Sequence, residues 1–426
     1  MNETAVILVS GILIIAFLCQ WLAWRLKLPS ILFLLLTGIV IGPIGHWFSP
    51  DQLFGKLLFP FISLSVSIIL FEGSLSLKLD QIRGHGRIVF NLVTIGVLCT
   101  TILTCLFSHY LLSLPWSIAA LFGSITAVSG PTVIVPMLRA IKPTQNIASI
   151  LRWEGILIDP IGALVAILIF IGIISFHSNT VWTMVVWHFL LTLGLGVGIG
   201  IIASLILAYL IQQQWVPEYL HNLATLSLVM LSFALSDHYA PGAGLFTVTA
   251  MGIMLANLPK VHIDEIIGFK ESLSLILIST AFIVLAARVN FSHIEEVITG
   301  MAIMLLLIQF VIRPCTVFLS TLGKNRLKWQ EKVLIAWIAP RGIIAASVAA
   351  IFSIQLTETH IASASAARML ILLTFIVIIG TVIFQSLTSR PLAKWLGVSE
   401  GEAKGMLIIG ASPFSIALAK TLQQLQ

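Results

Sequence analysis

The chain has 426 residues, of which 58% are hydrophobic and only 9% are charged. A soluble domain usually has about 25% charged and about 45–50% apolar residues, so this composition excludes a water-exposed globular protein. The net charge of +6 does not predict nucleic-acid binding, because the basic residues lie mainly in short loops between long apolar segments. We therefore expect an all-α membrane protein whose surface contacts lipid.

Thirteen apolar segments have lengths near the roughly 20 residues that a helix needs to cross a bilayer. These expected spans cover residues 4–24, 29–47, 57–77, 88–110, 115–138, 148–175, 180–211, 219–236, 243–258, 270–288, 296–322, 331–353 and 364–388. Cytoplasmic loops are enriched in Lys and Arg, and with the N-terminus outside only Lys56, Arg288 and Arg368 fall on the outer side. This distribution predicts an outer N-terminus and a cytoplasmic C-terminus.

The composition changes after residue 396. Residues 1–396 are predicted to form the transmembrane domain, and 397–426 to form a cytosolic linker followed by the start of a further domain. The pattern from Met406 predicts a buried strand, and a helix is expected to begin at Ser412. This order resembles the opening of a Rossmann nucleotide-binding domain, although only Gly410 matches its glycine fingerprint. An amphipathic tail is the alternative, and a nucleotide is expected only if the missing remainder of such a domain is present.

The fifth expected span contains a helix-breaking sequence, Ser129-Gly130-Pro131. Pro131 has no N–H and clashes with the preceding turn, and Gly130 permits an unwound backbone. We expect an interrupted helix whose freed carbonyl groups, together with Ser129, face a cation. A simple kink is the alternative interpretation.

The twelfth expected span contains a second break, where Pro340 and Gly342 flank Arg341. The two breaks lie in the fifth and the twelfth spans, seven places apart, so these spans run in opposite directions. If the fold consists of six spans, a linker span and six more, they also occupy corresponding positions in the two halves. Paired broken helices in two inverted halves are the best sequence indication of a transport site. Non-helical backbone at this depth is tolerated only beside protein or water.

The sixth expected span supplies two acidic residues, Glu154 and Asp159. Ionisable residues inside a membrane are costly and are functional candidates by default. The two are five residues apart, which corresponds to about 140° around a helix, so the spacing favours two different roles. We expect Glu154 to form a structural ion pair with Arg341, and direct binding of the ion is the alternative. Asp159, beside Pro160 and without a basic neighbour in sequence, is the expected cation and proton site.

Several segments together resemble the monovalent cation:proton antiporter family, especially the bacterial NhaP-like sodium/proton exchangers. They are Leu36-Thr-Gly38-Ile-Val-Ile-Gly42-Pro43, Phe71-Glu72-Gly73, the broken fifth span, the Glu154 and Asp159 pair, and Pro340-Arg341-Gly342. The resemblance extends over residues 4–390. Members often have Thr-Asp-Pro where this chain has Ser129-Gly130-Pro131, and Asn-Asp where it has Ile158-Asp159.

The resemblance implies an NhaA-like fold of two inverted repeats with crossed discontinuous helices in spans 5 and 12. It also implies a homodimer in the bacterial inner membrane that takes part in pH homeostasis. By position, Asp159 matches the ion-binding aspartate, Ser129 a residue that contacts the ion, Glu154 a structural glutamate and Arg341 a buried arginine. The function implied is secondary active exchange of Na+ or K+ for H+, with the metal ion on Asp159 and without a cofactor in this chain.

Other classes of function stay open at this point. A monovalent cation channel would need a continuous pore, and the chain has no carbonyl-filter sequence such as Thr-Val-Gly-Tyr-Gly. A sodium-coupled solute symporter would need a larger polar cavity than these few polar residues suggest. A membrane sensor that works through its cytosolic tail would not need two broken helices. We do not expect the chain to be an enzyme.

Overall fold

A computed structural model of the chain describes residues 3–26, 28–82, 84–175, 181–258, 264–289, 294–323, 327–358 and 364–399, with residues 410, 412–415 and 417 beyond them. The described part is helical, with a single isolated β-bridge. The first nine α-helices are α1 (Glu3–Leu26), α2 (Ser30–Ile39), α3 (Pro50–Phe54), α4 (Leu58–Leu75), α5 (Gly86–Asn91), α6 (Val97–Leu112), α7 (Trp116–Ala127), α8 (Pro131–Ile141) and α9 (Gln145–Ile174). The others are α10 (Val181–Gln212), α11 (His221–Tyr239), α12 (Ala243–Asn257), α13 (Asp264–Ala287), α14 (Ile294–Leu307), α15 (Arg313–Ser320), α16 (Trp329–Trp337), α17 (Ile343–Glu358) and α18 (Ala364–Trp395).

Within the described residues, eight helices are long and apolar enough to cross a membrane, or nine if the bent pair of α7 and α8 is one span. Four shorter apolar helices accompany them, at Ser30–Ile44, Ala243–Asn257, Ser272–Ala287 and Ile343–Thr357. Large apolar side chains such as Phe17, Trp182 and Ile202 are exposed on the outer surface of the bundle. The long apolar helices and this apolar surface identify an all-helical membrane protein, as expected. Its helices satisfy their backbone polar groups internally, as lipid requires.

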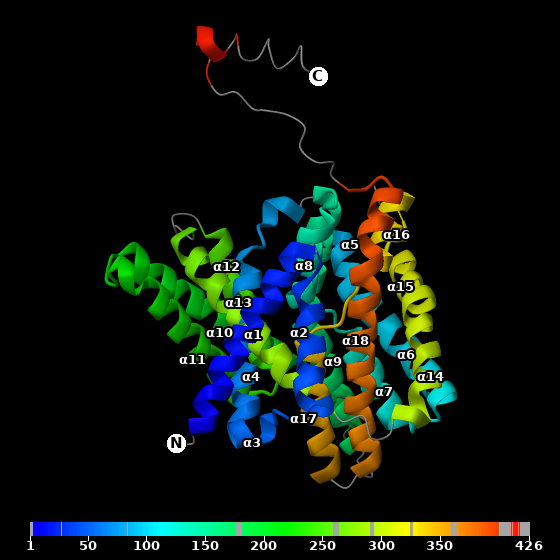
Figure 1. Cartoon of the computed structure of the whole chain (residues 1–426). Helices are drawn as coiled ribbons and strands as arrows, with labels where there is room; N and C mark the ends of the chain where they lie inside the picture. Colours follow the sequence, from blue (N-terminus) through cyan, green and yellow to red (C-terminus); the bar gives the residue numbers. More distant parts are fainter. Residues whose placement is uncertain are drawn as a thin grey trace.

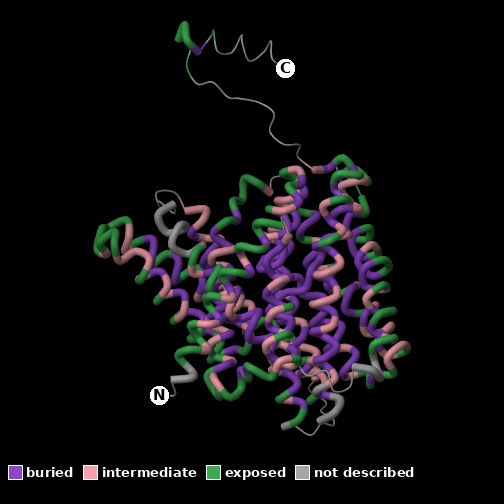
Figure 2. The backbone as a smooth tube through the Cα atoms, viewed as in Figure 1, coloured by how far each residue is buried: buried purple, intermediate pink, exposed green. Residues whose placement is uncertain are grey.

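The helices run broadly along one direction, and α1 begins at the opposite end of the bundle from the end of α18 (Figure 1). Buried residues are concentrated in the interior, where α9 lies among α4, α7, α8, α16 and α17 (Figure 2). In the part of the chain that the structure describes, three short π-helical segments interrupt the regular helices, at Val40–Ile44, Leu92–Gly96 and Ile308–Ile312. The third of these leads directly into α15 and matters for the site described below.

The four described residues that directly follow α18, 396–399, contact the membrane part. Gly397 has a positive φ of 68°, which ends the helix, and Leu396 and Val398 are buried. The amide of Thr144 donates a hydrogen bond to the Val398 carbonyl oxygen (3.0 Å), and Pro143 forms an antiparallel bridge with Ser399. Residues 396–399 are therefore held on the turn between α8 and α9. The expected strand from Met406 lies outside the described residues except for Gly410, and the structure has a helical turn at 413–415, just after Ser412.

Candidate functional site

The first break lies between α7 and α8, whose axes differ by 42°. Residues 128–130 are not helical: Val128 has φ −69° and ψ 121°, and Gly130 has φ −84° and ψ 140°. Pro131 is the first residue of α8, a position at which its missing N–H costs no intrahelical hydrogen bond. A residue before proline is also disfavoured in the α conformation, which explains the extended backbone of Gly130. The broken span expected from Gly130 and Pro131 is thus present in the structure.

The second break covers residues 338–342, between the end of α16 and the start of α17, and includes Pro340 and Gly342. The two breaks touch each other through their glycines. A Cβ atom built on Gly130 would lie 2.8 Å from the Cα of Gly342, and one built on Gly342 would lie 2.7 Å from the Cα of Gly130. Cβ atoms do not approach carbon this closely, so the contact between the two breaks requires glycine at both positions.

One face of α9 packs against the first break. A Cβ atom on Gly155 would lie 3.7 Å from the Cα of Pro131, and one on Gly162 would lie 2.4 Å from Cγ2 of Val128. Asp159 is four residues after Gly155 and three before Gly162, so all three lie on the same helix face. Asp159 is therefore placed opposite residues 128–131. The two glycines allow the backbone of α9 to pack closely against the first break on this face.

Four buried oxygen atoms at this place have no hydrogen-bond partner among the described residues. They are both carboxylate oxygens of Asp159, Oγ of Ser129 and Oγ1 of Thr132. Asp159 is 1% exposed and Ser129 is 0% exposed. Thr132 Oγ1 lies 3.2 Å from the Cβ position of Gly130 and 3.4 Å from that of Gly342, which places it between the two breaks. Buried polar groups are normally paired, so this set of oxygens is suited to a bound cation or proton.

The chemistry of the donors limits the ligand. No group of three or more His, Cys, Asp and Glu side chains that could hold a metal ion occurs within the described ranges. The site offers one carboxylate, two hydroxyls and the C-terminal end of α7, which has the negative end of the helix dipole and carbonyls without intrahelical partners. A single negative charge in an oxygen-lined site matches a monovalent hard cation.

Thr132 is the residue of this site that the sequence did not single out. It lies in the same short segment as Ser129, and its hydroxyl is one of several in an apolar span. The only available sequence signal was its position three residues after Ser129. That spacing has no fixed meaning across a helix break, because the chain changes direction there.

Glu154 pairs with a different arginine from the one expected. Its carboxylate accepts two hydrogen bonds from Arg313, Nη1 to Oε1 at 2.6 Å and Nη2 to Oε2 at 2.9 Å. Glu154 is 0% exposed and Arg313 is buried as well. Arg313 also donates to the carbonyl oxygens of Ile335 (3.4 Å) and Ile338 (3.5 Å) around the end of α16. The expected Glu154–Arg341 ion pair is thus wrong in its basic partner.

The geometry explains this correction. Glu154 and Asp159 point to different sides of α9, and the side of Glu154 faces α15 and α16, from which Arg313 reaches it. Arg341 lies within the second break, 3% exposed, and its Nε has no hydrogen-bond partner in the described part of the chain. It interacts electrostatically with both Arg313 and Glu154. One carboxylate therefore balances two neighbouring buried guanidinium groups, and only one of them is bonded to it directly.

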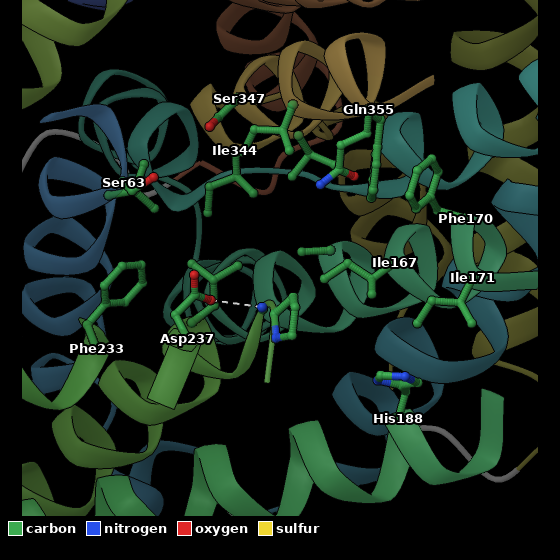
Figure 3. Close-up of a pocket in the computed structure, with 18 of the residues that line it drawn as sticks. Ser63, Ile167, Phe170, Ile171, His188, Phe233, Asp237, Ile344, Ser347 and Gln355 are labelled. Carbon is green, nitrogen blue, oxygen red and sulfur yellow. Dashed lines mark hydrogen bonds between the residues drawn. The ribbon is translucent and has the colours of Figure 1, made fainter. Parts of the chain in front are cut away.

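A cavity of about 430 Å³ leads toward this region from one end of the bundle. Its wall includes Ala163 of α9, one turn after Asp159, and Ser347 of α17. Figure 3 shows Asp237 of α11 on one side and Ser63, Ser347 and Gln355 across from it. Asp237 Oδ1 accepts a hydrogen bond from the amide of Gly242 (2.8 Å). Gln355 lies in the last turns of α17, which ends at the same end of the bundle at which α1 begins (Figure 1).

The chain was compared with protein-family models, with curated proteins and with solved structures. The family model described as "Sodium/hydrogen exchanger, transmembrane" matches residues 13–395. Na(+)/H(+) antiporter 1 of Methanocaldococcus jannaschii is 26% identical over 412 residues, which cover 91% of this chain and 92% of that protein. K(+)/H(+) antiporter NhaP2 of Shewanella sp. strain ANA-3 is 23% identical over 328 residues, covering 75% of this chain and 55% of that protein. The chain thus matches about half the length of the second relative.

The fold matches as well. The structure of the sodium proton antiporter MjNhaP1 from Methanocaldococcus jannaschii at pH 8 has a TM-score of 0.78 to this chain. The two are 23% identical, and the match covers 92% of this chain and 98% of that one. The resemblance inferred from the motifs is therefore confirmed by the comparison over most of the chain. This chain belongs to the transmembrane sodium/hydrogen exchanger family, which consists of transporters and not enzymes.

Proposed function

We propose that the chain exchanges one monovalent cation, Na+ or K+, for H+ across the membrane, and that Asp159 is the residue that both ions occupy in turn. The observation that supports this assignment most directly is the buried Asp159 carboxylate, neither oxygen of which has a hydrogen-bond partner among the described residues. Ser129 and Thr132 place two further oxygens without partners at the same break. The relatives named as Na+/H+ and K+/H+ antiporters agree with the exchange reaction.

The mechanism follows from charge. A bare carboxylate is costly to move through an apolar environment, whereas a carboxylate neutralised by a proton or a cation is not. The proton and the cation exclude each other, because both occupy the same oxygens. The carboxylate therefore passes through the apolar environment only when it carries a proton or a cation. One exchangeable carboxylate gives a stoichiometry of one proton per cation.

The architecture that we propose has thirteen spans arranged as two inverted repeats, with the broken helices of spans 5 and 12 crossing at their breaks. Support comes from the eight long apolar helices, the bent pair of α7 and α8, and the four shorter apolar helices, each of which overlaps one of the expected segments. The close contact of Gly130 with Gly342 agrees with crossing breaks. Access alternates, and in this conformation the cavity lined by Ala163 opens at the end of the bundle where α1 begins.

We further propose a bacterial inner-membrane location with an outer N-terminus, so that this cavity opens to the outside. The protein acts as a homodimer in lipid. Residues 397–426 form the linker and the start of a cytosolic regulatory domain, in which a nucleotide would bind only if the rest of that domain is present. The contact of residues 396–399 with the turn between α8 and α9 supports a link between such a tail and the ion site.

The test is proton-coupled flux in proteoliposomes, with Na+ and K+ supplied separately. Asp159→Asn keeps the shape of the side chain but removes its charge, so cation addition should cause no proton movement while the protein assembles as the wild type does. Asp51→Asn is the matched control, because Asp51 is exposed and pairs with Arg288 at the surface (3.0 Å). It should exchange normally.

Coupled exchange by Asp159→Asn at the wild-type rate would place the carrier elsewhere. Flux that does not saturate and needs no proton gradient would favour the alternative of a cation channel. Flux that needs an organic solute would favour a sodium-coupled symporter.

A further inference from the structure

Two buried glutamines close a ring of hydrogen bonds around the second break. The amide of Ala339 donates to Oε1 of Gln385 (3.1 Å). Nε2 of Gln385 then donates to Oε1 of Gln309 (2.8 Å), and Nε2 of Gln309 donates to the carbonyl oxygen of Trp337 (3.0 Å). The ring therefore runs from the backbone of Ala339, in the break, to the backbone of Trp337, the last residue of α16, and passes through side chains of two other helical segments.

The ring supplies hydrogen bonds that the main chain lacks there. When a helix stops, its last carbonyl groups and the amides that follow need partners outside the helix. The groups at Trp337 and Ala339 are in this position, because α16 ends at Trp337 and α17 begins only at Ile343. The neighbouring carbonyl of Ile338 receives its hydrogen bond from Arg313. Side chains therefore supply hydrogen bonds to three successive residues, the last of α16 and the first two of the break.

The glutamines come from segments whose local structure presents them inward. Gln309 is 5% exposed and lies in the π-helical segment Ile308–Ile312. This segment leads directly into α15, which begins at Arg313. Gln385 lies in α18 and is 1% exposed. π-bulges often occur at functional sites. A buried amide is costly unless it is paired, so apolar residues would be the cheaper choice for simple packing at these two positions.

A further contact fixes the same tryptophan from a second direction. The indole Nε1 of Trp337 donates to Oγ1 of Thr388, which lies three residues after Gln385 on α18 (2.9 Å). Both the backbone and the side chain of Trp337 are thus tied to neighbouring helices. Gly342 follows Ala339 by three residues and makes the close contact with Gly130. The position of Ala339 therefore sets where the second break meets the first.

We propose that Gln309 and Gln385 are positioning residues of the antiporter, which hold the second break in register with the first and thereby shape the ion site at Asp159. Neither glutamine contacts the ion; both act through the backbone of residues 337–342. The inference rests on the proposed exchange function, since its effect is measured on exchange. It predicts that the two residues act as one unit, because opening a closed ring at either amide releases the same backbone.

The experiment compares Gln385→Leu, Gln309→Leu and the double variant with the wild type in proteoliposomes, with cation concentration and pH both varied. Misplacement of a reacting site by about 1 Å can cost about 10²-fold in rate. We therefore expect each single variant to lower exchange at low cation concentration by roughly tenfold or more, with a higher half-saturating cation concentration. The double variant should be no worse than either single one, because residues in one network are not additive.

Thr381→Val is the matched control. Thr381 lies one turn before Gln385 on α18 and is buried. Among the described residues, its hydroxyl bonds only to carbonyls of its own helix, Val377 (2.7 Å) and Ile378 (3.2 Å). It should lower stability without changing the half-saturating cation concentration. If a leucine variant does not assemble, Gln385→Met, which matches the length of glutamine without its polar atoms, takes its place.

The outcomes separate this inference from the proposed function. If the wild type shows no coupled exchange, the proposed function fails. If the wild type exchanges and the glutamine variants lose melting temperature while their half-saturation and pH profile stay as in the wild type, the glutamines only stabilise the fold and the inference is overturned. Additive losses in the double variant would likewise show that the ring is not a unit.

Discussion

Replacing Glu154 with Gln perturbs the buried charge cluster at its centre. The substitution keeps the shape of the side chain but removes the carboxylate that pairs with Arg313. Opposite charges about 4 Å apart attract each other by about 4 kcal/mol at an effective dielectric constant of about 20. Removing one partner of a buried pair typically costs about 3–5 kcal/mol, because the other charge is left uncompensated.

The neighbouring Arg341 makes the costs unequal. In Glu154→Gln, two buried guanidinium groups face each other without a carboxylate, so the loss should reach the upper end of this range, about 5 kcal/mol. In Arg313→Met, Glu154 keeps its electrostatic interaction with Arg341, so the loss should be smaller. Arg341→Met removes a cation that has no direct ion pair with Glu154 and should cost least of the three.

The assay is the melting temperature in detergent, together with the fraction of protein that elutes as a single folded species. The expected order of destabilisation is Glu154→Gln, then Arg313→Met, then Arg341→Met. An Arg341→Met variant that melts below Arg313→Met would refute the reasoning, because it would make Arg341 the principal partner of Glu154. A Glu154→Gln variant that melts like the wild type would show that the cluster does not depend on that charge.

Three further predictions concern the ion site. Gly342→Ala should lower stability by about 1–3 kcal/mol through overpacking against Gly130, whereas Gly198→Ala, in open space on α10, should not. The measurement is the melting temperature, and equal melting temperatures of the two variants would show that the contact between the glycines is absent. Thr132→Val removes a polar contact worth about 1.5–3 kcal/mol to a charged group, so the half-saturating cation concentration should rise by about tenfold to a hundredfold. An unchanged value would exclude the Thr132 hydroxyl as a ligand. Below the pKa of the site, wild-type cation affinity should weaken about tenfold per pH unit, as measured by binding at several pH values; an affinity that ignores pH would show that proton and cation do not share Asp159.

Much of the fold follows from the sequence, because the membrane restricts it strongly. Lipid leaves a chain of this composition little choice except helices, so apolar length alone locates the long helices such as α1, α9 and α10. Proline and glycine act locally on the backbone, and for that reason Gly130-Pro131 and Pro340-Arg341-Gly342 predict the two interruptions. The local rarity of charge likewise singles out Asp159.

Pairings between distant segments could only come from the tertiary structure. Two arginines within expected spans, Arg313 and Arg341, could pair with Glu154. Both lie more than 150 positions after it along the chain, and no local rule decides between them. The choice depends on how α15 packs against α9, which brings Arg313 into bidentate contact and leaves Arg341 in the break. The same holds for Thr132, whose hydroxyl becomes part of the site only because Gly130 and Gly342 meet. Local chemistry thus determines where the helices run and break, whereas the packing of whole helices decides which buried charges and amides become partners.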